Sequence, residues 1–237
     1  MPHVEFRDFV LYLPTLLNGA KLTVLLSLII FGVSIVLALL VALGRLSRFP
    51  LLRIPLAAYV EFTRGTPGLV QIYYIFYVLP FWGVTLDAVA AGILGLSLNY
   101  GAYLSEVFRG GIQSVPPTQR EAATTIGLSY AQTLRFVILP QAFRTVLPPT
   151  ANYFLSLFKD TSLLSVITIK ELMFSGLLLE STTFNAFVIF TEIAIIYFVM
   201  CYPIAVLAGY LEYRMRRGRR VRWGGALRRI LPAVTHA

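Results

Sequence analysis

Residues 22–44 read LTVLLSLIIFGVSIVLALLVALG, a run that contains no charged residue. A helix needs roughly 20 predominantly apolar residues to cross the hydrocarbon core of a bilayer, and this run is longer than that. Backbone polar groups inside a bilayer must be hydrogen-bonded within the protein, which a helix achieves along its own length. The stretch therefore predicts a membrane-spanning helix.

The composition of the whole chain extends this prediction. Of 237 residues, 57% are hydrophobic and 13% are charged, and the mean hydropathy is +0.76. A soluble surface needs more charge than this, so we expect an all-α, polytopic integral membrane protein. The single cysteine, Cys201, excludes an intramolecular disulfide and a cysteine-rich metal site. Residues 1–17 lack the basic start of a cleavable signal and are expected to form an amphipathic helix at the membrane interface.

Four further apolar stretches follow the first. We place them at residues 54–79, 87–109, 143–158 and 185–211. The stretch 54–79 is expected to be broken by Gly65-Thr66-Pro67-Gly68. Residues 161–179 contain Lys170 and Glu171, whose charges make a lipid-exposed crossing costly. We expect a short helix there, packed against protein or at the outer interface. The prediction is five transmembrane helices, with six as the alternative if residues 161–179 also cross.

The placement of basic residues predicts the orientation, because arginine and lysine are retained on the cytoplasmic side. Five spans put the two ends of the chain on opposite faces. With the C-terminus in the cytoplasm, only four basic residues lie outside, namely Arg7, Lys21, Lys159 and Lys170. The cytoplasm then holds Arg45, Arg48, Arg53, Arg109, Arg120, Arg135, Arg144 and the arginines between residues 214 and 229. We therefore expect the N-terminus outside and residues 112–140 in a cytoplasmic loop.

The chain divides into a transmembrane domain, residues 1–213, and a basic cytoplasmic tail, residues 214–237. A run of arginines can also indicate nucleic-acid binding. Beside a membrane helix, however, anionic lipid headgroups or a cytoplasmic protein are better partners. We expect no nucleic acid as a partner, and the role of the tail stays open.

The cytoplasmic loop carries an ordered pattern. Glu121-Ala122-Ala123 is followed by Gly127 and then by Leu139-Pro140. Pro116-Pro117 breaks the preceding segment, and residues 118–130 can form a short helix with Glu121 near its N-terminus. Gly127 allows the backbone of a partner to approach closely. We expect this loop to be a docking element.

The pattern resembles the cytoplasmic signature loop of permease subunits of bacterial ABC importers, which docks on an ATPase subunit. Other blocks of the sequence look like permeases for polar amino acids, of the histidine, glutamine and arginine type. These blocks are Leu17-Asn18-Gly19 with Thr23, Glu61-Phe62-Thr63-Arg64-Gly65-Thr66-Pro67 with Gln71, Ala102-Tyr103 with Glu106 and Arg109-Gly110-Gly111, Gln119-Arg120-Glu121-Ala122-Ala123, and residues 152–163. The resemblance covers residues 17–209. It departs at Val137, where isoleucine is usual, and at Thr118, where glycine is frequent.

The resemblance implies a type I ABC importer architecture. In that arrangement two permease subunits, identical or related, line a pathway, two cytoplasmic ATPases bind ATP and magnesium, and an extracytoplasmic binding protein delivers the amino acid. The chain itself carries no phosphate-binding G-x-x-x-x-G-K-[ST] motif. We therefore expect a transporter subunit of the bacterial inner membrane that is not itself an enzyme and holds no cofactor. By this resemblance, Gln119, Arg120, Glu121, Ala122, Ala123, Gly127, Leu139 and Pro140 are the ATPase-coupling residues.

A pathway for an amino acid needs polar groups within the spans, and these are tolerated only where they line a cavity. Three stretches supply such groups at helical spacing. The second span offers Glu61, Arg64 and Gln71 in line with Gly68, and Thr66 lies in the backbone loosened by Pro67 and its neighbouring glycines. The third offers Asn99, Tyr103 and Glu106. The fourth offers Asn152, Ser156, Lys159 and Asp160, and Ser162 follows it. These residues, apart from Asn99, are our predicted pathway set.

Each of these residues also has a purely structural interpretation. Glu61 and Arg64 can neutralise each other as a buried pair, and Lys159 with Asp160 can form an external gate or an interface anchor. At the level of the whole protein, the alternative is an ion-coupled secondary amino-acid transporter. The hydropathy shows no inverted repeat in its favour. A membrane anchor without a pathway is disfavoured by the intramembrane charges. The identity of the amino acid, and whether the permease pair is a homodimer or a heterodimer, stay open.

Overall fold

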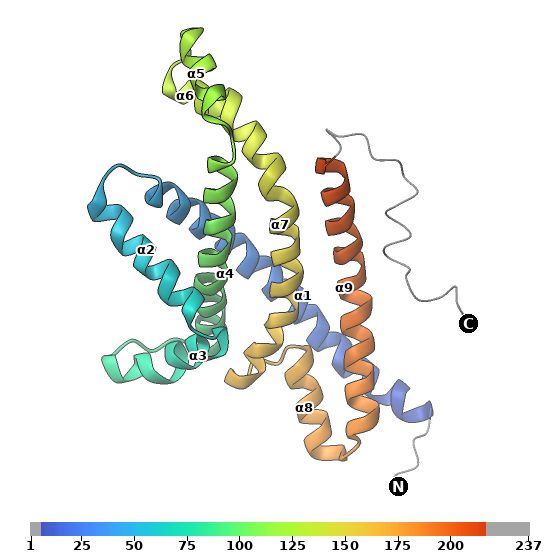
Figure 1. Ribbon diagram of the computed structural model, residues 1–237. Coiled ribbons are helices and arrows are strands. Elements are labelled where there is room, and N and C mark those ends of the chain that lie inside the picture. The colour runs from blue at the N-terminus through green and yellow to red at the C-terminus, as the bar shows by residue number, and fades with distance from the viewer. Residues whose placement is uncertain (1–5, 217–237) are drawn as a thin grey trace.

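A computed structural model describes residues 6–216, and all regular structure in that range is helical. The first helix, α1 (Phe6–Arg45), runs obliquely across the others and packs most extensively on α4 (Ala88–Gln113) (Figure 1). Its aliphatic side chains are buried on the α4 side, as Ile30 and Ala38 show. The separate interfacial helix expected within residues 1–17 is not observed from residue 6 onward. Helix α1 instead continues through Pro14, which lies inside the helix.

The second predicted span, residues 54–79, is interrupted where the Gly65-Thr66-Pro67-Gly68 sequence predicted a break. It is divided into α2 (Pro50–Gly65), α3 (Gly68–Tyr73), a π-helical turn η1 (Tyr74–Val78) and a 3-10 turn η2 (Leu79–Trp82). The break falls at Thr66, whose backbone is extended (φ −119°, ψ 140°). A residue that precedes proline is biased toward extended backbone, so Pro67 explains the break.

Helix α4 lies at the centre of the bundle. Asp87 caps it by accepting hydrogen bonds from the backbone N–H groups of Val89 and Ala90. The main hydrophobic cluster joins α4 to α1, α3 and the end of α7 through Ile30, Ile72, Leu96, Leu157 and Leu164. Because this core fixes α4 against the break between α2 and α3, it also positions the polar residues described below.

Helices α5 (Pro117–Thr125) and α6 (Tyr130–Thr133) project beyond the end of the bundle, between α4 and α7 (Leu139–Asp160) (Figure 1). The predicted helix over residues 118–130 is therefore too long. Gly127 has a left-handed backbone (φ 81°) that ends α5. Ser129 and Gln132 then form a capping box that begins α6. A π-helical turn, η3 (Leu134–Ile138), leads into α7.

Residues 161–179 form a short helix packed against protein, the first of the two predicted arrangements. A 3-10 turn, η4 (Thr161–Ile167), ends at Thr168 in the left-handed region (φ 64°). The 12-residue helix α8 (Leu172–Thr183) then packs on α1 and α9 (Ala186–Arg216). Its cap, Glu171, is fully buried and also accepts hydrogen bonds from Thr23 of α1 and Tyr197 of α9. One carboxylate therefore joins three helices.

Three helices of the described chain are long and apolar enough to cross a membrane: residues 10–45, 88–113 and 186–215. A fourth is counted if the bent pair made of residues 130–167 and 172–183 is one span. The count of five and the orientation stay predictions. Helix α9 continues to Arg216, past the predicted domain boundary at 213, and the tail from residue 217 lies outside the described residues.

Candidate functional site

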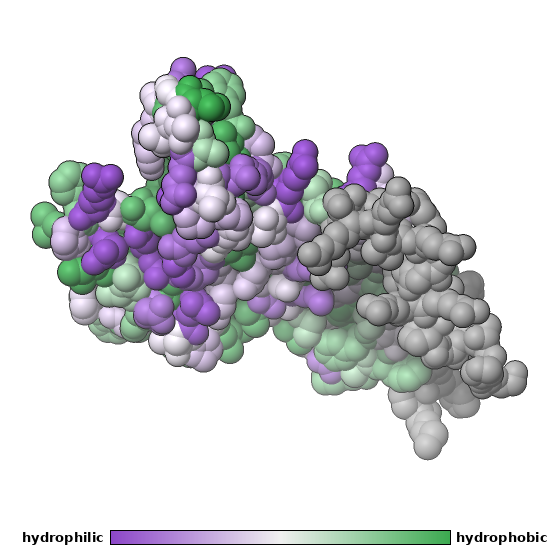
Figure 2. All heavy atoms as spheres, turned by 45° about the horizontal axis from the view of Figure 1, so that its top comes forward, coloured by the Kyte–Doolittle hydropathy of each residue, from purple (hydrophilic) through white to green (hydrophobic). Residues whose placement is uncertain are grey.

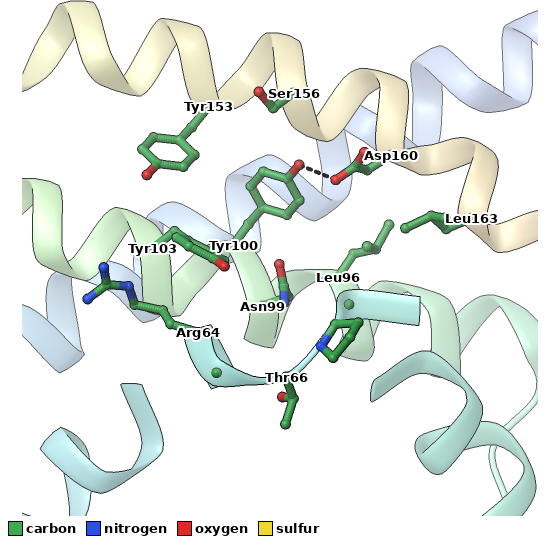
Figure 3. Close-up of a pocket in the computed structure, with 13 residues that line it drawn as sticks. Arg64, Thr66, Leu96, Asn99, Tyr100, Tyr103, Tyr153, Ser156, Asp160 and Leu163 are labelled. Atoms are coloured by element: carbon green, nitrogen blue, oxygen red, sulfur yellow. Dashed lines mark hydrogen bonds between the residues drawn. The ribbon is translucent and has the colours of Figure 1, made fainter. Parts of the chain in front are cut away.

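A polar cavity of about 460 Å³ lies between the α2–α3 break, α4 and α7 (Figure 3). We call it the tyrosine cavity. Its lining residues are Arg64, Gly65, Thr66, Pro67, Gly68, Leu96, Asn99, Tyr100, Tyr103, Tyr153, Ser156, Asp160 and Leu163.

Helical periodicity explains how α4 and α7 contribute to the tyrosine cavity. Residues three, four and seven positions apart share one face of a helix. On α4 this face carries Leu96, Asn99 or Tyr100, and Tyr103, and on α7 it carries Tyr153, Ser156 and Asp160. The third wall is different, because it is made where the chain is extended at Thr66 and Pro67, between the glycines that end α2 and begin α3.

Two contacts cross the walls of the cavity. The Tyr100 hydroxyl donates a 2.7 Å hydrogen bond to the Asp160 carboxylate, which joins α4 to α7 (Figure 3). The Arg64 guanidinium lies over the Tyr103 ring, 5.8 Å from its centroid. Such a cation–π contact is favourable where the cation is partly removed from water. It ties the end of α2 to α4.

Gln71 fixes the shape of the break. Its side-chain nitrogen donates to the backbone oxygens of Thr63 and Thr66, at 2.8 and 3.1 Å, and to the Thr66 hydroxyl at 2.8 Å. Its side-chain oxygen accepts a 3.3 Å hydrogen bond from Asn99 of α4. Carbonyls released by the helix break are thereby satisfied, which a low-dielectric setting requires. Gln71 supports the cavity from behind and is not one of its lining residues.

The structure brings together five members of the predicted pathway set in the tyrosine cavity: Arg64, Thr66, Tyr103, Ser156 and Asp160. Asn152 instead lines another hollow with Arg144 and Glu212. Lys159 is exposed outside the cavity, and Ser162 is half-buried and does not line it. The substrate contacts of all these residues stay predictions.

Sequence reasoning missed Tyr100 and Tyr153, which line the tyrosine cavity. Aromatic residues in a hydrophobic span are expected to pack in the core, so their residue type did not indicate a polar site. The usable signal was position, since Tyr100 is adjacent to the polar Asn99 and Tyr153 lies three residues before Ser156 on one helical face.

The other charged residues of the predicted set gather nearer to α5. Glu106 forms ion pairs with Arg45 of α1 and, at 2.6 Å, with Arg109 of α4. Glu61 lines a second hollow of about 470 Å³, which we call the arginine cavity. Its lining residues are Arg45, Arg53, Ile54, Ala57, Ala58, Glu61, Arg109 and Gln113. The buried pair of Glu61 with Arg64 is not observed, because both are exposed and the described chain has no ion pair between them.

Hydrophilic residues gather on the face below the α5–α6 projection, at the left and centre of the view (Figure 2). Glu61 and Arg64 belong to an exposed face of α2. Charged side chains at membrane depth are costly against lipid and are found facing a water-filled cavity or other protein. We therefore expect this side of α2 to face water or another protein chain.

The α5–α6 projection is itself exposed. Gln119, Arg120, Glu121, Ala122 and Gly127 are exposed, and only Ala123 of the Glu121-Ala122-Ala123 sequence is buried. Leu139 and Pro140 are exposed at the start of α7. Large apolar side chains lie beside them, with 76% of Ile126, 79% of Tyr130 and 63% of Phe136 exposed.

The tyrosine cavity offers a carboxylate, a guanidinium and several hydroxyls to a small polar molecule, and its 460 Å³ suffice for one. Residues 6–216 contain no group of three or more histidine, cysteine, aspartate or glutamate side chains placed to hold a metal ion. The arrangement suits reversible binding by hydrogen bonds and ion pairs.

Comparison with known proteins assigns the family. Residues 34–217 match the family described as binding-protein-dependent transport system inner membrane component. The chain is 42% identical over 205 residues to the L-cystine transport system permease protein TcyB of Bacillus subtilis (strain 168), covering 86% of this chain and 88% of that protein. It is 34% identical over 206 residues to the glutamine transport system permease protein GlnP of Escherichia coli (strain K12), covering 86% and 94%.

Solved structures agree. A crystal structure of an amino acid ABC transporter with histidines superimposes with a TM-score of 0.84 at 34% identity, covering 89% of this chain and 99% of that chain. The MetNI methionine ABC transporter, in an inward-facing conformation, shares the fold with a TM-score of 0.67 at 16% identity, covering 90% and 100%. The chain therefore belongs to the binding-protein-dependent transport system inner membrane components, among the permease proteins of amino-acid ABC transporters.

Proposed function

We propose that this chain forms the translocation pathway of an ATP-driven importer for amino acids in a bacterial inner membrane, as one of a pair of permease subunits. Two separate ATPase chains, which hold ATP and magnesium, and an extracytoplasmic binding protein complete the importer. The pathway passes through the tyrosine cavity. Its carboxylate and guanidinium complement the ammonium and carboxylate that every α-amino acid carries.

One observation carries the proposal: the α5–α6 projection is exposed and apolar at its tip. A monomeric soluble surface rarely presents clustered large apolar side chains, and such clusters mark interaction sites. Ile126, Tyr130 and Phe136 lie in the loop that contains Glu121 and Gly127. An ATPase seated on this loop would cover them.

The same loop provides mechanical coupling. It is connected to α4 and α7, the two helices that carry most of the tyrosine cavity. A movement of the docked ATPases would reach the cavity through these two helices. ATP binding and hydrolysis would then favour outward-open and inward-facing arrangements in turn, by differential binding to the two states.

Native mass spectrometry of the tagged chain, purified from its own membrane in a gentle detergent, tests the assembly. We expect two permease chains with two ATPase chains, and the masses also distinguish a homodimer from a heterodimer. Recovery of this chain without an ATPase, under conditions that preserve known ABC complexes, would instead favour the ion-coupled secondary transporter.

A further inference from the structure

The two cavities follow one another along α4. Asn99 and Tyr103 line the tyrosine cavity, whereas Arg109 and Gln113 line the arginine cavity. Gln113 is the last residue of α4, and α5 begins four residues later. The arginine cavity therefore lies on the α5 side of the tyrosine cavity.

The contact between Arg64 and Tyr103 separates the two cavities. Arg64 follows Glu61 by about one helical turn on α2, and Tyr103 precedes Glu106 by about one turn on α4. Arg64 and Tyr103 line the tyrosine cavity, whereas Glu61 lines the arginine cavity and Glu106 holds two of its arginines. The stacked pair therefore lies between the two cavities.

The arginine cavity has charged side chains that form no ion pair within the described residues, although Glu61 interacts electrostatically with Arg45 at longer range. Glu106 pairs with Arg45 and Arg109. Within residues 6–216, neither Arg53 nor Glu61 has an ion-pair partner. The buried Nε of Arg109 has no hydrogen-bond acceptor in the same range, and an unsatisfied buried donor is costly. Arg53 and Glu61 thus supply a cation and an anion without ion pairs to one hollow, beside Arg109, whose guanidinium also donates a 2.7 Å hydrogen bond to Gln113.

We propose that the arginine cavity is a second amino-acid site, on the exit side of the Arg64–Tyr103 pair. Arg53 and Arg109 bind the α-carboxylate, and Glu61 binds the α-ammonium. Arginine is well suited to the first role, because its planar guanidinium makes charge-assisted hydrogen bonds to carboxylates. The site rests on the proposed function, since it needs an amino acid that crosses the tyrosine cavity.

The lining also indicates what this site recognises. Its apolar lining residues are Ile54, Ala57 and Ala58, which offer no side-chain hydrogen bond to a substrate side chain. Gln113, the uncharged polar residue of this lining, already accepts a hydrogen bond from Arg109. The hollow of about 470 Å³ matches the 460 Å³ of the tyrosine cavity. The second site therefore recognises the α-carboxylate and the α-ammonium, which all amino acids share. It holds the amino acid before release.

The test measures how much amino acid the intact complex binds. The full transporter is reconstituted without nucleotide in nanodiscs of zwitterionic lipid, so that anionic headgroups do not fill the arginine cavity. The probe is a radiolabelled mixture of the protein L-amino acids with cystine included, and the readout is saturable label bound per permease chain. Variants are Arg53→Gln and Glu61→Gln, with Ser156→Phe to fill the tyrosine cavity. Arg48→Gln is the matched control, because Arg48 is exposed and lines neither cavity.

We expect Arg53→Gln and Glu61→Gln each to remove half of the bound label, Ser156→Phe to remove the other half, and Arg48→Gln to bind as the wild type does. Native mass spectrometry of each variant confirms assembly. The second site is overturned if Ser156→Phe abolishes all saturable binding while Arg53→Gln binds as much label as the wild type. The proposed function would still stand in that case. Absence of saturable binding in the wild-type complex would overturn both.

Discussion

Tyr100 of α4 and Asp160 of α7 are joined across the tyrosine cavity by a hydrogen bond of 2.7 Å. The bond links the two helices that enter the α5–α6 projection from opposite sides. Its donor is a neutral hydroxyl and its acceptor a carboxylate, a combination stronger than a bond between two neutral groups.

Removing this bond should loosen α7 from α4. We expect Tyr100→Phe to lower the free energy of unfolding by about 1.5–3 kcal/mol, the usual contribution of a hydrogen bond to a charged group. Thermal unfolding of the purified chain in detergent measures the change. Tyr103→Phe is the control, because it deletes a hydroxyl from the same cavity that has no hydrogen bond within the described chain. Equal melting temperatures for the two variants would show that the Tyr100 bond does not hold the helices.

Glu171 should be required for the packing of α1, α8 and α9. Glu171→Ala removes the cap of α8 and leaves Thr23 and Tyr197 without this acceptor. We expect a loss of about 2 kcal/mol or more, because cap loss and unsatisfied buried groups both contribute. Thermal unfolding measures the loss.

Glu171→Gln provides the matched comparison. The amide keeps one acceptor oxygen and the shape of the side chain, so it should recover part of the stability lost in Glu171→Ala. Glu180→Ala, which changes a partly exposed glutamate of α8, is the control. If Glu171→Ala is as stable as Glu180→Ala, Glu171 does not hold α1, α8 and α9 together.

A substitution at Gly127 should affect the docking of an ATPase without disturbing the fold of this chain. A Cβ added at Gly127 meets no atom within 4 Å, so the chain itself has room for a side chain. We expect Gly127→Arg to insert into the membrane normally and to reduce ATP-driven amino-acid uptake to background, because the arginine would lie between α5 and a docked ATPase. Uptake into proteoliposomes and co-purification of the ATPase measure the effect.

The left-handed backbone of Gly127 requires its own control. Its φ of 81° is unfavourable for most residues, but asparagine tolerates that region. We expect Gly127→Asn to retain uptake. If Gly127→Arg transports at the wild-type rate, the assignment of this loop to ATPase coupling is wrong.

The orientation can be tested at the turn between α8 and α9. Ser181 is exposed near the end of α8. In a Cys201→Ala background, Ser181→Cys should react with an impermeant thiol reagent added from outside to intact cells, since the positive-inside rule places this turn outside. Thr124→Cys in the exposed part of α5 is the reference and should react only in inside-out vesicles. Reversed labelling of the two sites would invert the topology.

Hydropathy predicted the long helices because the bilayer requires apolar length, and α1, α4 and α9 contain the stretches expected from it. Within residues 54–79 an average over apolar residues does not register the extended residue Thr66, and the break was predicted instead from the glycines and the proline of residues 65–68. The end of α5 was missed, because the left-handed backbone at Gly127 is a local property.

The tyrosine cavity was predicted in part. Arg64 and Asp160 were found because charge in a hydrophobic segment needs a partner or a cavity. Asn152 was placed with Ser156 and Asp160 by steps of four, yet each such step drifts by about 40° around an α-helix. The observed lining begins at Tyr153 instead. Spacing alone could not distinguish these two neighbours, because the face that α7 presents depends on its packing against α4.

The four hydrogen bonds of Gln71 make the interruption of the second span a rigid bracket. We expect α2, α3 and α4 to move together at this point, because Asn99 joins α4 to the same hydrogen-bond network. Thr168, whose left-handed backbone lies between η4 and α8, is outside this network. In a cycle between outward-open and inward-facing states, the network and the cavity beside it would then move as one unit relative to α8 and α9.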